Sequence, residues 1–434
     1  MYDLYKRLED PLFTLLGVVK FHTLLKKTES YNETEIQRYQ QKQLSSLLVY
    51  CSKYIPFYRR QFIELNVDPY GQDAVAELKK LPILTKEIIR NNYEYFISSK
   101  EHNSLEFHTS GTSGDPFTVL TSTNQWVVEQ GVVWRSWKRA GYRFRDKIAI
   151  IRSYNPNPSQ PKIKRDTLKN WRYYSVYHMD DASLAQYFKD FKVWKPKYLR
   201  GYPGSILLLA NYADKNNIKL EGLKGILTAS ERLEESARAR IEDVFQTRVY
   251  DHYGQAEITA MYHNCEVGKL MHDDWEYGFS EFIPHKKNEH KLIATNLHNR
   301  SMPLLRYDTG DLVCLSDIKC RCGRQSVALK QILGRSMNFI EDSDNVSYPI
   351  VNLYTHFADK KTIKQFQICQ YVAGKLEVKL KFWDSVSSEE ALLETEMISL
   401  YLKKFKCEAS FSNEPFLMSE DGKLTPFISR LGRI

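Results

Sequence analysis

Apolar residues recur at helical spacing through the first third of the chain, and this pattern predicts several amphipathic helices. The first is expected over residues 33–52, with one apolar face made of Ile36, Tyr39, Leu44, Leu47, Leu48 and Cys51. Pro56 should end it, because proline lacks the N–H group that a continuing helix needs. Residues 76–95 predict two short helices separated by Leu81-Pro82-Ile83, and residues 125–140 predict a helix whose tryptophans pack in a core.

Short apolar runs then alternate with helical patterns. Buried strands are expected at residues 148–151, 198–199, 223–228 and 248–253. The helices between them are predicted to begin at a cap formed by Ser183, to cover residues 205–215, and to carry an apolar face from Leu233 to Phe245. Such alternation implies right-handed crossovers and a largely parallel sheet, so the fold class is α/β.

The pattern changes after Gly334-Arg335. Residues 365–372 and 375–382 read as paired strands around Ala373-Gly374, and a helix capped by Ser388 should follow, with one more strand after it. These elements make a small α+β unit that is large enough to be a domain. We therefore predict a large N-terminal domain with mainly parallel sheets flanked by helices over residues 1–335, and a small mobile C-terminal domain over residues 336–434.

The composition is that of a folded protein, and it does not identify a binding partner. The chain has 434 residues, 42% of them hydrophobic, and a formal net charge of +9. It can bury a substantial core, and its charge suits polyanionic ligands or an anionic membrane surface, although a solvated surface explains the charge equally well. A basic run at residues 161–172 contains no recognisable nucleic-acid motif, so no specific binding of DNA or RNA is expected. The oligomeric state cannot be read from the sequence.

The cysteines indicate a reducing compartment. Their number, seven, is odd, which argues against a pure disulfide framework. Four of them lie among apolar residues and are expected to fill the core: Cys51, Cys314, Cys369 and Cys407. The start of the chain lacks the basic segment of a secretory signal. We therefore expect a cytoplasmic protein.

Residues 11–25 form the most apolar early segment. Lys20 and His22 interrupt it, and it is too short to span a bilayer. A helix that docks on the rest of the protein is the first interpretation, and weak attachment to a membrane surface is the alternative.

A polar loop precedes the first tryptophan-bearing helix. It consists of Thr109, Ser110, Gly111, Thr112, Ser113 and Gly114. Glycines allow close approach of the backbone to a ligand, and backbone N–H groups and hydroxyls can point at one anion. The loop is a candidate phosphate cradle without the lysine of a P-loop, and a polar surface loop is the alternative.

Three later segments add to this loop: Tyr253-Gly254-Gln255-Ala256-Glu257, Tyr307-Asp308-Thr309-Gly310-Asp311 and Gly334-Arg335. Together with Gly422-Lys423, they resemble in order and spacing the core motifs of the adenylate-forming superfamily. The likeness is strongest to the phenylacetate–CoA ligase branch, particularly its relatives associated with capsular polysaccharide biosynthesis, and it covers the chain from about residue 30 to the end.

The resemblance implies a role for each matched residue. Lys423 would be the mobile catalytic lysine, Glu257 would hold Mg²⁺, Tyr253 would stack on adenine, and Asp311 would accept hydrogen bonds from the ribose hydroxyls. The residues expected to bind the nucleotide are those of the polar loop together with Ala229, Ser230, Glu231, Tyr253, Gly254, Asp311 and Arg335.

The resemblance also implies an activity. The chain would use ATP and Mg²⁺ to convert a carboxylic acid to an acyl-adenylate and then transfer the acyl group, first of all to coenzyme A. An amine, for instance on an amino sugar, is the alternative acceptor, and a non-catalytic nucleotide-binding scaffold is the alternative class. Phe117-Thr118 and Met337-Asn338 depart from the residues that many relatives carry at the phosphate loop and at the hinge.

A metal site is indicated as well. Cys320 and Cys322 form a Cys-x-Cys pair, and Cys265 and His272 lie upstream. Three thiolates and an imidazole suit tetrahedral Zn²⁺ in a closed structural site, and His263 is the rival imidazole. The pairing of these segments resembles the zinc-bearing members of the same branch.

Overall fold

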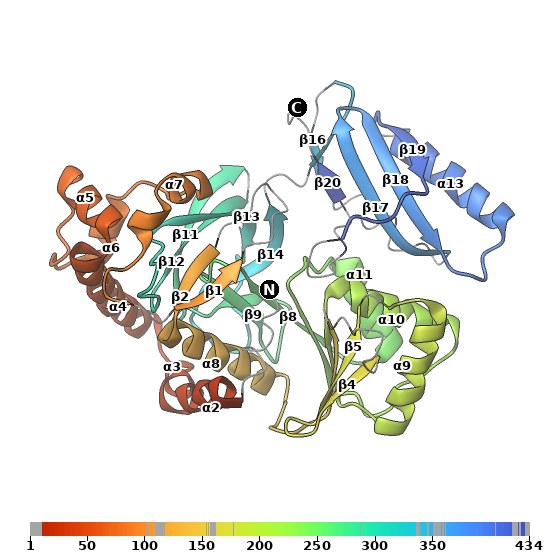
Figure 1. Cartoon of the computed structure of the whole chain (residues 1–434), viewed down its shortest axis with the longest axis horizontal. Helices are drawn as coiled ribbons and strands as arrows, with labels where there is room; N and C mark the ends of the chain where they lie inside the picture. Colours follow the sequence, from red (N-terminus) through yellow and green to blue (C-terminus); the bar gives the residue numbers. More distant parts are fainter. Residues whose placement is uncertain are drawn as a thin grey trace. The chain divides into compact units, whose positions relative to one another are not determined.

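The computed structural model describes residues 11–101, 104–108, 118–152, 154, 156, 162–176, 178–286, 288–335, 339–344, 347–349, 357, 360, 362–403, 405–418, 424 and 427–429. Its contacts divide the chain into two compact units (Figure 1). Unit 1 comprises residues 1–142 and 251–334, and unit 2 comprises residues 143–250 and 335–434. One division thus falls next to the predicted domain boundary, and the independent motion of residues 336–434 stays a prediction.

Unit 1 begins with helices. In chain order they are α2 (Pro11–Lys20), the π-helix η1 (Phe21–Leu25), α3 (Lys26–Thr28), α4 (Glu33–Tyr54), α5 (Pro56–Glu64), α6 (Ala74–Lys79), α7 (Lys86–Asn91) and the 3₁₀-helix η2 (Tyr93–Phe96). Asn32 and Glu35 form a capping box that starts α4. The predicted apolar face of α4 packs in a core with Leu304 and Tyr307, which confirms the helical pattern.

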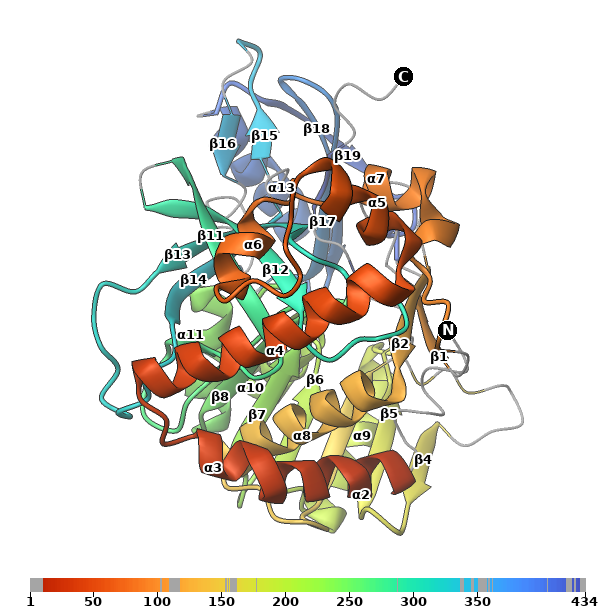
Figure 2. The same ribbon diagram turned by 90° about the vertical axis from the view of Figure 1, so that its left-hand side faces the viewer.

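The helix predicted over residues 125–140 is α8 (Thr123–Arg139), and Trp126, Trp134 and Trp137 are buried as expected. The segment predicted to dock on the rest of the protein does so, because α2 lies along α8 (Figure 2). Gly17 faces Gln130 and Gly131 so closely that a Cβ atom at Gly17 would collide with them. No helix among the described residues is long and apolar enough to cross a membrane.

The strand pairs of unit 1 are antiparallel, whereas mainly parallel sheets were predicted for residues 1–335 as a whole. They are β1 (Ser104–His108), β2 (Thr118–Ser122), β8 (Val249–Gly254), which crosses the division between the units, β9 (Met261–Asn264), β10 (Met271–Asp273), β11 (Gly278–Lys286), β12 (Glu289–Asn296), β13 (Tyr307–Leu315) and β14 (Ala328–Arg335). Within this unit the sheet order is β11-β12-β13-β14-β10-β9-β8. β11 and β12 are joined by a short turn through Asn288, which leaves no room for a crossover helix.

Unit 2 holds the parallel sheet that the sequence predicts. Its elements are β3 (Ile148–Arg152), β4 (Ile163–Asp166), β5 (Trp171–Ser175), α9 (Asp181–Trp194), β6 (Tyr198–Gly201), α10 (Pro203–Lys215), β7 (Gly225–Ala229) and α11 (Glu235–Phe245). Strands β5, β3, β6 and β7 run parallel, and apolar faces of all three helices join one core. The mixed α/β class is thereby confirmed. The cap of α9 was misassigned, because Asp180 accepts from the backbone of Ser183 and is the capping residue.

The rest of unit 2 contains the predicted small sheet. Its elements are β15 (Phe339–Glu341), β16 (Ser347–Pro349), β17 (Ile363–Val372), β18 (Lys375–Phe382), α13 (Ser388–Lys403), β19 (Glu408–Ser412) and β20 (Phe427–Ser429). The sheet order β19-β18-β17-β20 is covered on one face by α13 (Figure 1). The predicted hairpin around Ala373-Gly374 is confirmed, and the cap of α13 is Ser387 rather than Ser388.

All seven cysteines lie in described parts of the chain, and no disulfide joins any two of them. Cys51, Cys369 and Cys407 are buried, as expected of core fillers. Cys314 is only half-buried, so its assignment to the core was wrong. It lies near the end of β13, directly after the buried Leu312 and Val313.

Candidate functional site

In unit 2, the carboxyl ends of parallel strands bring polar groups together. Strand β3 ends at Arg152, β6 at Gly201, and β7 at Ala229, and the three strands are adjacent in the sheet. This edge is where ligands bind in open α/β sheets. The predicted turn Ala229-Ser230-Glu231 lies there, as the sequence indicated.

Hydrogen bonds fix the shape of this turn. Ser230 has a left-handed backbone with φ of 72°, and its hydroxyl accepts a hydrogen bond from Arg152 at 3.2 Å. The carboxylate of Glu231 accepts from the backbone N–H of Gly204, in the first turn of α10, at 3.0 Å. The Arg152 guanidinium also lies over the ring of Tyr202, with 5.1 Å between its carbon and the ring centroid. Two hydrogen bonds thus tie this turn to β3 and to α10.

In unit 1, two of the motifs meet through Tyr253 and Asp311. Tyr253 lies on β8, Asp311 lies on β13, and the tyrosine hydroxyl donates to the aspartate carboxylate at 2.6 Å. Burial and the adjacent Asp311 carboxylate raise the pKa of Tyr253 well above its usual value, so the hydroxyl keeps its proton. Gly310 precedes Asp311 with φ of 74°, a left-handed conformation that favours glycine and orients the carboxylate.

The same two motifs meet a second time at Glu257. Its side chain is 7% exposed, and its Oε1 atom accepts from the Tyr307 hydroxyl at 2.7 Å and from Lys86 Nζ at 3.0 Å. Glu257 lies within a turn that is closed by Ile258, which has φ of 53° and donates its N–H to the carbonyl of Gln255. The carboxylate is thus buried, paired and oriented toward β13.

Lys86 reaches Glu257 because α7 is joined to β13 through the backbone. Leu84 donates its N–H to the carbonyl of Arg306 and accepts from the N–H of Asp308, both at 2.9 Å. This bridge places Thr85, which caps α7, and then Lys86 beside Tyr307. Lys86, which is far from Glu257 in the sequence, is thereby placed next to the Glu257 carboxylate.

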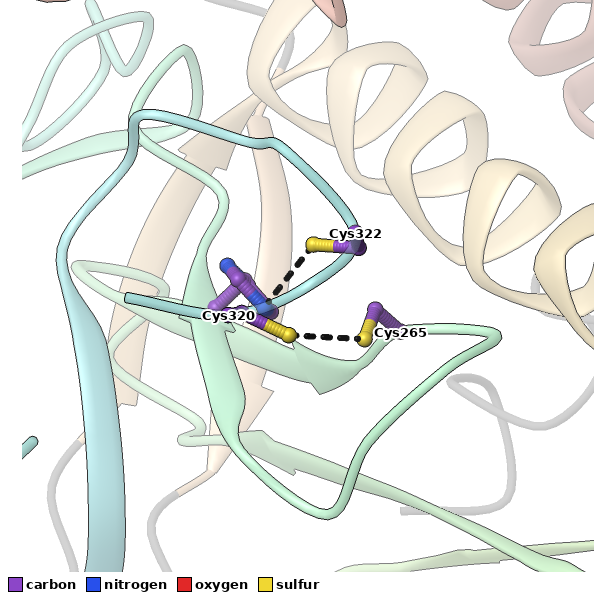
Figure 3. Close-up of side chains that lie close together, drawn as sticks. Cys265, Cys320 and Cys322 are labelled. Atoms are coloured by element: carbon purple, nitrogen blue, oxygen red, sulfur yellow. Dashed lines mark hydrogen bonds between the residues drawn. The ribbon is translucent and has the colours of Figure 1, made fainter. Parts of the chain in front are cut away.

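The four predicted metal ligands of unit 1 converge on one point. Cys265 follows β9, His272 lies on β10, and Cys320 and Cys322 lie in the loop between β13 and β14. Their ligand atoms all lie within 4.8 Å of one another. Cys265 Sγ is 3.6 Å from Cys320 Sγ, and Cys322 Sγ is 3.5 Å from His272 Nε2. Figure 3 shows the three thiol groups turned toward one another.

The surroundings of this cluster favour ionised sulfur at one position. Burial opposes ionisation of Cys265, yet hydrogen bonds from His272 and from the backbone of Gly268 lower the pKa of its thiol to about 6. Burial raises the pKa of the Cys320 thiol to about 11. Arg324 Nη1 also donates to Glu266 at 2.9 Å, so an ion pair joins the loops that carry Cys322 and Cys265.

His263, the rival imidazole, lies elsewhere. Its Nδ1 atom contacts the carboxylate of Asp274, and its ring stacks on that of His252 with centroids 4.3 Å apart. Asp274 also accepts from the buried guanidinium of Arg135 at 2.7 Å. His263 therefore belongs to a buried charge network, and the arrangement suits Cys265, His272, Cys320 and Cys322 as one ligand set.

Several predicted site residues cannot be placed. The loop Thr109–Gly114 and Lys423 lie outside the described residues, and Arg335 is described only as the last backbone position of β14. Conversely, sequence reasoning missed Lys86, Tyr307 as a partner of Glu257, and Arg152. Tyr307 stood inside a quoted motif, whereas Lys86 and Arg152 carried no local signal because tertiary contacts alone bring them to the site.

Known proteins with similar sequences include a CapK protein and several phenylacetate-coenzyme A ligases. No protein-family model matches the chain. A CapK protein from Staphylococcus aureus is 27% identical over 325 residues, which make up 70% of this chain and 69% of that protein. A phenylacetate-coenzyme A ligase from Thermus thermophilus is 25% identical over 369 residues, 81% of this chain and 82% of that protein. One from Pseudomonas putida is 26% identical over 330 residues, 72% and 73% of the two chains.

Solved structures share the fold. 2-Hydroxyisobutyryl-CoA ligase in the postadenylation state, in complex with R3-HIB-AMP, superimposes with a TM-score of 0.70 at 15% identity, covering 93% of this chain and 91% of that one. The same ligase in the thioesterification state, with 2-HIB-AMP and CoA, gives a TM-score of 0.56 at 17% identity, covering 94% and 92%. The chain is therefore similar in sequence to CapK and to phenylacetate-coenzyme A ligases, and it shares the fold of a CoA ligase solved with an acyl-adenylate.

Proposed function

We propose that the protein activates a carboxylic acid with ATP, forming an acyl-adenylate and pyrophosphate, and then transfers the acyl group to coenzyme A. The observation that carries this proposal is a pair of contacts, which we call the junction, between β13 and the segment made of β8 and the turn that follows it. Tyr253 with Asp311, and Glu257 with Tyr307 and Lys86, bring acceptors for hydroxyl groups and a buried carboxylate into one small region of unit 1.

The first half-reaction needs charge neutralisation more than covalent chemistry. An oxygen of the acid attacks the α-phosphorus of ATP, the bond from that phosphorus to the bridging oxygen breaks, and pyrophosphate leaves with the bond's electron pair. The attacking carboxylate is anionic and approaches a polyanion, so cations must offset the repulsion. In this chain we assign that role to Lys423, and Lys86 is a second cation held beside Glu257.

Each acceptor of the junction has a protein partner that a nucleotide can replace. Asp311 accepts from the Tyr253 hydroxyl, and its two oxygens can instead accept from the two ribose hydroxyls. The ring of Tyr253 would then support the adenine. Glu257 is a buried carboxylate of the type that Mg²⁺ prefers, and a bound Mg²⁺ would supply further positive charge at the phosphates. In that state Lys86 would be released from Glu257 toward the anionic ligand.

The proposed acceptor is coenzyme A. Relatives that bear the name phenylacetate-coenzyme A ligase support this choice. A thiol and an amine react with acyl-adenylates alike once they are positioned, so the acceptor is decided by binding rather than by the chemistry of the adenylate. Transfer to an amine, as on an amino sugar, is the outcome that would replace coenzyme A while leaving the adenylation half intact.

We further propose that Cys265, His272, Cys320 and Cys322 bind one structural Zn²⁺. Four converging donors of soft and borderline type, with an ion pair joining two of their loops, are what a closed tetrahedral site requires. The metal would tie the loop between β13 and β14 to β9 and β10. Because β13 carries Tyr307 and Asp311, the zinc would support the nucleotide site without taking part in the reaction.

Product analysis by mass spectrometry tests the proposed function. The full chain is incubated with ATP, Mg²⁺ and a panel of aromatic and aliphatic acids, with coenzyme A or with a panel of amino sugars. An acyl-thioester that requires ATP is the expected product. An acyl-amide without any thioester would overturn the choice of acceptor, and the absence of AMP release with every acid would overturn the proposed reaction.

A further inference from the structure

Helix α13 is apolar on two opposite sides. Ile398 and Leu402 are fully buried in the core of the small sheet. On the other side, four large side chains are exposed: Leu392 by 62%, Leu393 by 58%, Met397 by 49% and Leu400 by 67%. We call these four residues the outer face of α13. An apolar stripe on a helix normally packs against a partner.

The other long helices of unit 2 show that this outer face is unusual. Helices α10 and α11, both fully described, expose no large apolar side chain, and α9 exposes only Val193. Single exposed apolar residues are common on protein surfaces, whereas contiguous apolar patches mark interaction surfaces. The spacing of the four residues places them along one stripe of α13, so they form such a patch.

We propose that the outer face of α13 is covered by the same face of a second copy of this chain, in a twofold symmetric homodimer. The charges at the two ends of the stripe favour a self-complementary partner. Glu389 is exposed in the first turn of α13, and Lys403 is exposed in the last turn. Helices related by a twofold axis across their common face run antiparallel, so each acidic end meets the basic end of the second copy.

This pairing fixes a register. When Glu389 of one copy lies level with Lys403 of the other, Leu392 lies level with Leu400, and both contacts occur twice. The same register places Glu396, which is exposed within the stripe, close to the twofold axis and opposite its own counterpart. Two carboxylates at that position repel each other. The dimer should therefore be reversible, and loss of the Glu396 charge should strengthen it.

Sedimentation velocity over a wide range of concentrations tests the proposal on the full chain. The wild type is expected to show a monomer–dimer equilibrium. The double variant Leu393→Glu, Leu400→Glu should raise the dissociation constant by about a hundredfold or more, since it places charges in the apolar centre. Val193→Glu is the matched control on another helix and should leave the equilibrium unchanged. A wild type that stays monomeric at every concentration would overturn the proposal.

Reversing the charges of Glu389 and Lys403 distinguishes pairing with a second copy of the chain from binding of another partner at this face. Glu389→Lys and Lys403→Glu should each raise the dissociation constant by about tenfold, because each brings like charges together. An equimolar mixture of the two variants should restore wild-type dimerisation, as should one chain that carries both changes. Glu396→Gln should lower the dissociation constant by about tenfold.

Failure of the mixture to restore the dimer would contradict the antiparallel register, even if the single variants are weakened. Circular dichroism and melting curves identify any variant that does not fold. The test does not depend on the proposed enzymatic activity, because its readout is the mass of the particle.

Discussion

Two clusters of polar side chains in unit 1 differ in how their atoms are satisfied. In the cluster formed by Tyr253, Asp311, Glu257, Tyr307 and Lys86, every carboxylate already has a donor from the protein, at 2.6 to 3.0 Å. In the cysteine–histidine cluster, four donor atoms lie within 4.8 Å of one another and face a common point. In the first cluster each carboxylate is paired with a protein donor that a ligand could replace. In the second cluster the four atoms surround a common point.

The difference separates two kinds of site. An exchangeable pair keeps a buried carboxylate satisfied until a ligand offers better donors, which suits a substrate that binds and leaves. Four ligands that converge with no open position suit a metal that stays, since such a site contributes to folding itself. We therefore expect changes in the first cluster to affect catalysis and nucleotide binding, and changes in the second to affect stability and metal content.

The largest effect is expected from Lys423→Ala. Loss of the cation that we assign to the α-phosphate should slow acyl-adenylate formation by about a hundredfold to a thousandfold, because preorganised charge dominates this kind of catalysis. Affinity for ATP should stay within a few-fold of the wild type. Single-turnover adenylation and equilibrium ATP binding measure the two quantities. Lys375→Ala, at an exposed position of β18, is the control.

If Lys423→Ala adenylates at the wild-type rate, Lys423 has no part in the mechanism. The exchangeable cluster would then have to supply the positive charge through Lys86 alone.

Changes in the cysteine–histidine cluster should alter metal content and thermal stability. Purified wild-type protein should contain about one zinc per chain, and Cys322→Ser should lose it and lower the melting temperature by about 5 °C or more, because metal binding is coupled to folding. Cys314→Ser alters a half-buried cysteine of β13 outside the cluster and should keep the metal. Elemental analysis and thermal melts give the readouts.

Wild-type protein purified without chelator and found to lack stoichiometric zinc would end the metal hypothesis. A Cys322→Ser variant that stays folded yet cannot form adenylate would instead place the cluster in the reaction.

A smaller effect is expected from Asp311→Ala. The ribose would lose both of its acceptors, so the dissociation constant for ATP should rise by about tenfold to a hundredfold. Asp317→Ala, which changes an exposed aspartate just beyond β13, should have no effect. Calorimetric titration with ATP gives the comparison, and an unchanged affinity in Asp311→Ala would remove the ribose assignment.

The smallest effect is expected from Tyr253→Phe. The variant keeps the ring for adenine and removes only the hydroxyl that donates to Asp311 in the free protein. ATP affinity should therefore stay within about threefold of the wild type, since the lost hydrogen bond is one that the nucleotide replaces. A loss as large as that of Asp311→Ala would mean that the pair is structural and not exchangeable.

The parts of the site that the sequence predicts are those carried by short, ordered motifs. Tyr253, Glu257 and Asp311 lie in segments that resemble motifs of the adenylate-forming superfamily, and this resemblance implied that they serve one nucleotide site. Cys265, His272, Cys320 and Cys322 were predicted as a ligand set because three thiolates and an imidazole suit tetrahedral Zn²⁺ and because their pairing resembles zinc-bearing relatives. The helices 33–52 and 125–140 were predicted because their apolar faces are long and regular.

What the sequence could not reveal depends on contacts between distant segments. Lys86 reaches Glu257 only through the backbone bridge of Leu84 to β13, and Arg152 reaches Ser230 only because β3 and β7 end at one edge. The strands of unit 1 are antiparallel, which apolar runs alone do not distinguish from parallel ones. Asp180 caps α9 in place of Ser183, because two polar residues close together offered competing caps.

The most direct test of the central claim is acid-dependent exchange of pyrophosphate into ATP. It is measured with a panel of carboxylic acids on three proteins: the wild type, Glu257→Gln and Cys322→Ser, the last assayed below its melting temperature. We predict exchange in the wild type with at least one acid, a loss of about a hundredfold in Glu257→Gln, and retention of exchange in folded Cys322→Ser. Exchange that is absent with every acid, or that is equally fast in Glu257→Gln, would contradict the account.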